Sequence, residues 1–117
     1  MNEPIQNNLF RITYPTGYLE LYLDSFFPCT VAKSRKLFKL IKEFCSQEQK
    51  DALLTHLVQR AKAYEEKAVE LDRQMDACHS DPAEYNRLFG EMKETCRKHT
   101  RIARNIRDFT GRCGYED

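Results

Sequence analysis

The feature that most constrains this fold is a regular series of apolar residues between positions 54 and 78. The series advances by alternating steps of three and four residues: Leu54, Leu57, Ala61, Tyr64, Ala68, Leu71, Met75 and Cys78. This is the heptad spacing of a helix that packs lengthwise against another helix. Just before the series, Ser46 is followed three residues later by Gln49, the pattern of a capping box. We therefore predict one long helix over residues 47–78.

A second long helix is predicted over residues 82–109. Asp81 and Pro82 suit the N-cap and the first position of a helix, and Gly111 suits its end. Its apolar positions predict a buried side with these members: Tyr85, Leu88, Phe89, Met92, Cys96, His99, Ile102, Ala103, Ile106 and Phe109. Because the turn between the two helices is short, they should lie antiparallel.

The segment LFRITYPTGYLELYL, residues 9–23, predicts a β-hairpin. Both arms are rich in aromatic and other β-favouring residues, and residues 15–17 suit a three-residue loop. On that register Tyr14 pairs with Tyr18, and both share a face with Tyr22. This aromatic face is either an interaction surface, with base stacking as one use, or a face folded against the helices.

Between the hairpin and the long helices, residues 31–45 predict a shorter amphipathic helix with a basic outer side. With 117 residues, the chain suits a single domain, residues 1–117. The predicted fold class is α+β: an N-terminal β-hairpin packed on a three-helix assembly that is dominated by a long antiparallel coiled-coil helical hairpin.

Charge is unevenly distributed along a chain whose net charge is only +1. Residues 46–94 hold eleven acids and seven bases, whereas residues 95–117 hold six bases and three acids. The helical hairpin should therefore have an acidic tip, formed by Glu65, Glu66, Glu70, Asp72 and Asp76, and a basic root. Leu88 and Phe89 cannot both be covered by two helices, which predicts apolar surface near the tip for a partner or a second copy.

The principal candidate site is a basic stripe on the root. On the last helix it comprises Arg97, Arg101, Arg104 and Arg107, extended on the shorter helix by Arg35, Lys39 and Lys42. We expect nearby acids to leave these arginines largely uncompensated. We expect the stripe to bind an acidic protein surface, which is favoured by a small margin, or nucleic-acid phosphate. The alternative is that the stripe is only the solvated flank of a coiled coil.

Neither a metal site nor a catalytic site is predicted. The pair Cys78 and His79 should lie roughly 27 Å from Cys96 and His99, too far apart to share one metal ion. Cys96 and His99 are expected on the buried seam, which argues against a nucleophile pair. No cofactor-binding motif is present, so we expect a non-enzymatic protein without a cofactor. Five cysteines, an odd number, and the lack of a signal peptide favour a cytoplasmic protein.

These features together predict a protein that binds another macromolecule. In general layout the chain resembles the short, motif-poor proteins of phages and mobile elements that inhibit host machinery, including nucleic-acid-associated enzymes. That resemblance implies a small protein-binding regulator or inhibitor, whose acidic tip would occupy a basic channel. The alternatives are direct DNA or RNA binding through the arginines and a structural homodimer through the helical hairpin; no membrane partner is expected.

Overall fold

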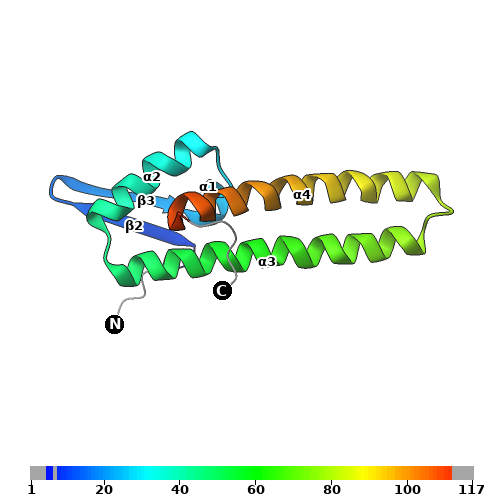
Figure 1. Cartoon of the computed structure of the whole chain (residues 1–117), viewed down its shortest axis with the longest axis horizontal. Coiled ribbons are helices and arrows are strands. Elements are labelled where there is room, and N and C mark those ends of the chain that lie inside the picture. Colours follow the sequence, from blue (N-terminus) through cyan, green and yellow to red (C-terminus); the bar gives the residue numbers. More distant parts are fainter. Residues whose placement is uncertain (1–4, 7, 112–117) are drawn as a thin grey trace.

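The computed structural model describes residues 5–6 and 8–111. The protein is an elongated α+β structure of 60 × 28 × 25 Å in which a β-hairpin packs on helices (Figure 1). Its strands are β1 (Ile5–Gln6), β2 (Leu9–Tyr14) and β3 (Gly17–Tyr22), and its helices are α1 (Leu23–Phe26), α2 (Val31–Phe44), α3 (Gln47–Ala77) and α4 (Pro82–Thr110). The bounds predicted for the three longer helices were correct to within one residue. Strand β1 and the single turn α1 were not predicted.

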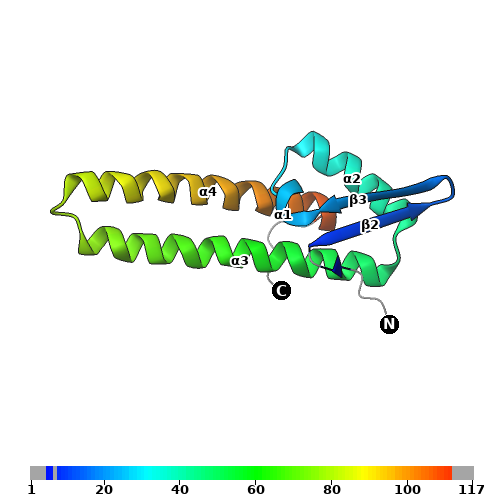
Figure 2. The same cartoon turned by 180° about the vertical axis from the view of Figure 1, so that it is seen from behind.

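The helices α3 and α4 lie side by side and antiparallel, which confirms the predicted helical hairpin (Figures 1 and 2). The capping box of α3 is complete: the Gln49 N–H donates to Ser46 Oγ at 3.2 Å, and the Ser46 N–H donates to Gln49 Oε1 at 3.1 Å. Asp81 caps α4 by accepting from the Glu84 N–H at 3.3 Å. Gly111 ends α4 in the left-handed conformation, with φ at 74°, where glycine is favoured.

The seam of α4 is narrower than the predicted buried side. Its members recur at steps of four and three: Leu88, Met92, Thr95, His99, Ile102 and Ile106. Tyr85, Phe89 and Cys96 were predicted to be buried, but all three are exposed. Phe89 and Cys96 each lie about 100° around the helix from a seam residue, and a single neighbouring helix covers only the seam. Tyr85 continues the spacing of the seam, but it lies in the first turn of α4, at the end of the helical hairpin.

The strands form one antiparallel sheet in the order β1-β2-β3. The register of the hairpin differs from the prediction because its turn has two residues, Pro15 and Thr16, instead of three. Tyr14 pairs with Gly17, and Tyr18 pairs with Thr13. A register shift of one residue moves a side chain to the opposite face of the sheet, so the predicted shared face of Tyr14, Tyr18 and Tyr22 is wrong.

The main core lies at the root, where the sheet, α1, α2 and the root ends of α3 and α4 meet. Its fully buried members include Phe10, Ile12, Phe27, Ile41, Leu57 and Ile102. Phe38 stacks on Phe27 at 6.0 Å between ring centroids and contacts Phe109 at 4.9 Å. Burying each large side chain contributes about 1.5–3 kcal/mol, so this cluster fixes how α2 sits against α4. A smaller cluster, Leu71, Met75 and Leu88, holds the tip together.

Arg60 of α3 ties the α1 segment to the long hairpin. Its guanidinium donates to the carbonyl oxygens of Leu23, at 3.3 Å, and Phe27, and to the Tyr64 hydroxyl at 2.7 Å. Leu23 is the first residue of α1 and Phe27 follows its last, and the Leu23 carbonyl also accepts from the Phe27 N–H at 2.9 Å. The connection that follows α1 is thereby held where it leads into α2.

Candidate partner-binding surface

A buried amide on α4 positions the start of α2. Asn105 Oδ1 accepts from the Cys29 N–H at 3.0 Å, and Asn105 Nδ2 donates to the Cys29 carbonyl at 3.1 Å. The next residue, Thr30, caps α2 by accepting from the Lys33 N–H at 3.3 Å. The N-terminus of α2 therefore lies beside the side of α4 that carries the arginines.

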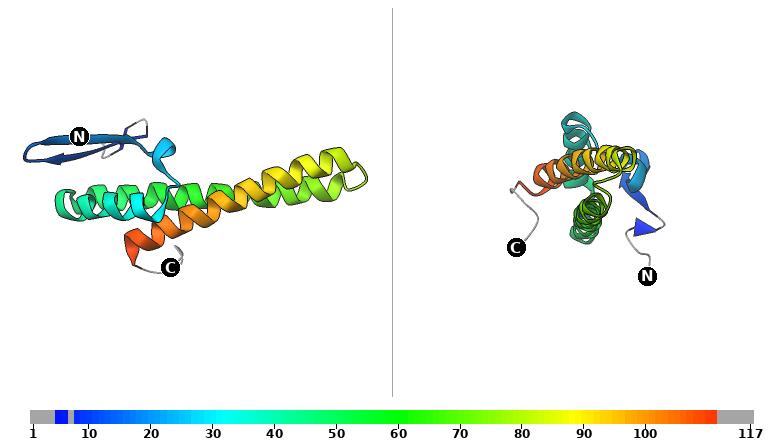
Figure 3. Two further views of the ribbon diagram at one scale, coloured as in Figure 1. Left: turned by 90° about the horizontal axis from the view of Figure 1, so that it is seen from above. Right: turned by 90° about the vertical axis from the view of Figure 1, so that its right-hand side faces the viewer.

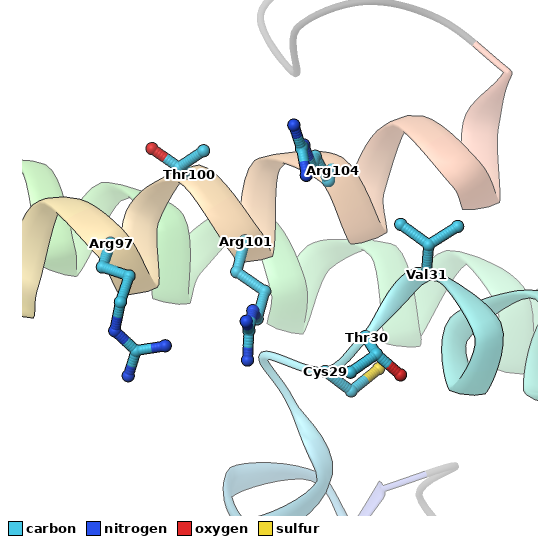
Figure 4. A pocket seen from close by; sticks show the side chains of 7 residues that line it. All are labelled: Cys29, Thr30, Val31, Arg97, Thr100, Arg101 and Arg104. Atoms are coloured by element: carbon cyan, nitrogen blue, oxygen red, sulfur yellow. The ribbon is translucent and has the colours of Figure 1, made fainter.

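A pocket of about 420 Å³ lies at this junction. It is lined by Cys29, Thr30, Val31, Arg97, Thr100, Arg101 and Arg104. Figure 4 shows Arg97 and Arg101 extending to the side of α4 on which Cys29 and Thr30 lie, whereas Arg104 extends the other way. The structure therefore brings three of the four predicted arginines to one pocket, together with the N-terminus of α2.

Positive charge at this pocket is only partly compensated. Arg97 pairs with Glu94, 2.6 Å from Nη2 to Oε1, so the expectation that nearby acids leave the stripe uncovered is wrong for Arg97. Hydrogen bonding from Arg97 lowers the pKa of Glu94, and the charge of Arg101 adds a smaller contribution. In the described part of the chain, no acidic side chain forms an ion pair with Arg101 or Arg104. The positive end of the α2 dipole lies beside them, and its first turn has no acidic residue.

The basic residues of α2 surround a second, shallower depression of about 190 Å³. It is lined by Arg35, Phe38, Lys39, Lys42 and Asp108. Asp108 of α4 places a negative charge among these three cations, so this depression is less positive than the pocket. Arg107 is exposed and lines neither hollow. The predicted stripe is thus divided into two basic hollows and one separate arginine.

The three tyrosines predicted as one interface are separated. Tyr14 is half-buried against Phe44, with ring centroids 5.4 Å apart. Tyr18 and Tyr22 lie on the other face of the sheet, each 60% exposed. There Arg11 lies 4.6 Å from the centre of the Tyr18 ring. Tyr14 therefore belongs to the packing of the hairpin on the helices, and only Tyr18 and Tyr22 remain available to a partner.

Several acids of the predicted tip are paired within the protein. Glu70 pairs with Arg73, and Glu65 lies 3.1 Å from His99 Nε2. Further along, Arg87 pairs with Glu84 and Glu91. Glu66, Asp72 and Asp76 are exposed. Of the two apolar tip candidates, Leu88 is buried at 2% exposure and Phe89 is 47% exposed. Arginines therefore compensate Glu70, Glu84 and Glu91 locally, whereas Glu66, Asp72 and Asp76 remain exposed acids of the tip.

The cysteines do not assemble with histidines. In the described residues, no group of three histidine, cysteine or acidic side chains is placed to hold a metal ion. The prediction that Cys96 is buried beside His99 is wrong: Cys96 is exposed, and His99 contacts Glu65. Burial raises the pKa of the Cys29 thiol to about 11, so this thiol is protonated at neutral pH.

The pocket wall opposite the arginines was not predicted from the sequence. Cys29 and Thr30 lie outside the predicted elements, Val31 only begins the helix predicted over residues 31–45, and Asn105 is absent from the predicted buried side of the last helix. A threonine before an apolar helix is a recognisable N-cap, so the helix start carried a signal. No feature of the sequence indicated that this helix start lies beside α4.

Comparisons with protein-family models, with curated proteins and with solved structures find no match to this chain. None of the helices in the described residues combines the length and apolar character that crossing a membrane requires.

Proposed function

We propose that this is a non-enzymatic regulator that binds an acidic surface of another protein through the basic hollows between α2 and α4. The observation that carries the proposal is the pair Arg101 and Arg104. Both line the pocket beside the N-terminus of α2, with no ion-pair partner in the described residues. Arginine forms planar, bidentate contacts with carboxylates and is enriched at protein interfaces.

The near-neutral charge of the chain supports an acidic protein over nucleic acid as the partner. Nucleic-acid-binding domains are usually strongly basic overall, whereas this chain has a net charge of +1. Asp108 and Glu94 also place carboxylates beside the basic hollows, where they would oppose a continuous phosphate backbone. An inhibitor of a nucleic-acid-associated enzyme in the cytoplasm remains our more specific proposal for its role.

A double charge reversal tests the proposal. Arg101→Glu with Arg104→Glu should abolish capture of the partner from nuclease-treated lysate of the source cells, and raising the salt should weaken capture by the unaltered protein. The control reverses Lys62 and Lys67 to glutamate, two exposed residues of α3, which changes the net charge equally and should leave capture intact. Equal capture by both double variants would reject the proposal.

Gel-shift assays with duplex DNA and single-stranded RNA test the rival function, direct nucleic-acid binding. We expect the protein to retard neither nucleic acid at low salt. Retention that falls steeply with salt, disappears in the Arg101/Arg104 variant and persists in the Lys62/Lys67 variant would identify a nucleic-acid binder instead.

A further inference from the structure

Strand β3 has an open edge. It pairs with β2 on one side, and no strand of the described residues pairs with it on the other. Because the two-residue turn makes Tyr14 and Gly17 a hydrogen-bonded pair, alternate residues of β3 direct their backbone groups toward β2. The intervening residues, Tyr18 and Glu20, direct both N–H and C=O outward, and Tyr22 directs its N–H outward.

This edge lacks the usual protection against strand pairing. Natural edge strands are commonly blunted by lysine, proline or a covering helix, but the sequence GYLELY contains neither residue. Figure 3 shows the hairpin to one side of the helices, with its turn reaching beyond their root ends. Tyr18 and Tyr22 are each 60% exposed and Leu19 is 37% exposed. Half of the large apolar side chains exposed in the described residues thus lie on this one strand.

We propose that β3 pairs antiparallel with β3 of a second copy of this chain. Residues 18–22 read YLELY, which is the same sequence in both directions. Pairing centred on Glu20 therefore sets Tyr18 opposite Tyr22 of the second copy and Leu19 opposite Leu21 of the second copy. The outward backbone groups then meet in a hydrogen-bonded register, and the exposed tyrosines form aromatic cross-strand pairs.

The palindrome is what selects a second copy as the occupant. Any extended segment could form hydrogen bonds with the open backbone edge. An identical strand that runs antiparallel also places tyrosine opposite tyrosine and leucine opposite leucine. The cost of this register is that the two Glu20 carboxylates face each other, and like charges directly opposite are destabilising. Arg11 lies 3.3 Å from Glu20 in each copy and offsets part of that repulsion. The pairing does not involve the basic hollows, so it is independent of the proposed function.

Sedimentation equilibrium of the full chain under reducing conditions tests this pairing. The unaltered protein should form dimers as its concentration rises. Glu20→Pro should abolish them, because proline removes an outward N–H while leaving the β2 pairing intact. Glu20→Gln should tighten the dimer by about two- to fivefold, since it removes the opposed charges. Phe89→Ser, at the tip, is the control and should leave dimerisation unchanged.

A monomer at all concentrations, or a dimer that survives Glu20→Pro, would overturn the proposal. Loss of the dimer in Phe89→Ser with retention in Glu20→Pro would place the interface at the tip instead. Amide hydrogen exchange by NMR needs no variant. The amides of Tyr18, Glu20 and Tyr22 should gain protection with rising protein concentration, whereas those of Leu19 and Leu21 should be protected throughout. Unchanged exchange at the first three would also refute the pairing.

Discussion

Asn105 and Cys29, 76 residues apart in the chain, are joined by two hydrogen bonds between the side-chain amide of one and the backbone of the other. Asn105 is fully buried and Cys29 is 7% exposed. The Cys29 peptide groups lie in a connection that has no regular secondary structure to satisfy them, and α4 supplies the missing donor and acceptor. This contact places the N-terminus of α2 beside Arg101, and so determines the shape of the pocket.

Asn105→Ala should lower the free energy of unfolding by about 2–4 kcal/mol, because it leaves both a donor and an acceptor of Cys29 buried without partners. Urea unfolding followed by circular dichroism measures the change. The control is Asn86→Ala, at an exposed position on the same helix, which should change stability by less than about 0.5 kcal/mol. Equal effects at the two positions would show that the Asn105 bonds do not stabilise this junction.

His56 should make the protein less stable in mild acid. Burial lowers the pKa of His56 in the folded protein, although Asp24, 3.5 Å from its Nε2, partly opposes the shift, while Arg60 reinforces it. The unfolded chain, with a histidine pKa near about 6.5, then binds the proton more readily than the folded protein. Stability should therefore fall as the pH drops through about 6.5 and level off below the folded pKa of His56.

Replacing His56 isolates this effect. His56→Gln should flatten the dependence of the unfolding free energy on pH between about 7 and 5, as measured by urea unfolding at each pH. His79→Gln, in the exposed turn after α3, should retain the slope. Asp24 affects stability over a separate, lower pH range, because a hydrogen bond from Asn8 lowers its pKa. The contribution of Asp24 to stability is therefore lost only as the pH falls further, through that lowered pKa. A slope unchanged in His56→Gln would assign the acid sensitivity elsewhere.

The thiols should differ strongly in reactivity. Cys29 is buried with a pKa of about 11, so little reactive thiolate forms at pH 8. Cys96 is exposed. Brief treatment with iodoacetamide followed by peptide mass spectrometry should show alkylation at Cys96 well before Cys29, and urea should equalise the two. Rapid alkylation of Cys29 in the folded protein would mean that the junction between α2 and α4 opens readily.

The long helices were predictable because their signals are local. A heptad series, the Ser46 cap and the Asp81–Pro82 start each lie within a few residues of the structure they determine. The register of the hairpin was not predictable, since Pro15, Thr16 and Gly17 suit a loop of either two or three residues. A register shift of one residue moves the side chains of a strand to the opposite face of the sheet.

The candidate site was predictable in composition but not in arrangement. The predicted stripe took no account of Glu94, although a spacing of three residues on a helix is a local signal for its pair with Arg97. The meeting of Cys29 with Asn105 depends on how α2 packs on α4. That packing is set by the root core, through contacts such as Phe38 with Phe109, and no spacing within either helix encodes it.

Truncation of two adjacent residues at the tip should destabilise the protein by very different amounts. Leu88 is 2% exposed and packs with Leu71 and Met75, so Leu88→Ala should lower the free energy of unfolding by about 2–5 kcal/mol. Phe89 is 47% exposed, and its ring lies 5.7 Å from the Lys93 ammonium. Phe89→Ala should therefore cost less than about 1 kcal/mol, although it removes more atoms. Urea unfolding at a low protein concentration gives both values, and a larger loss for Phe89→Ala would place its ring, instead of Leu88, on the buried seam.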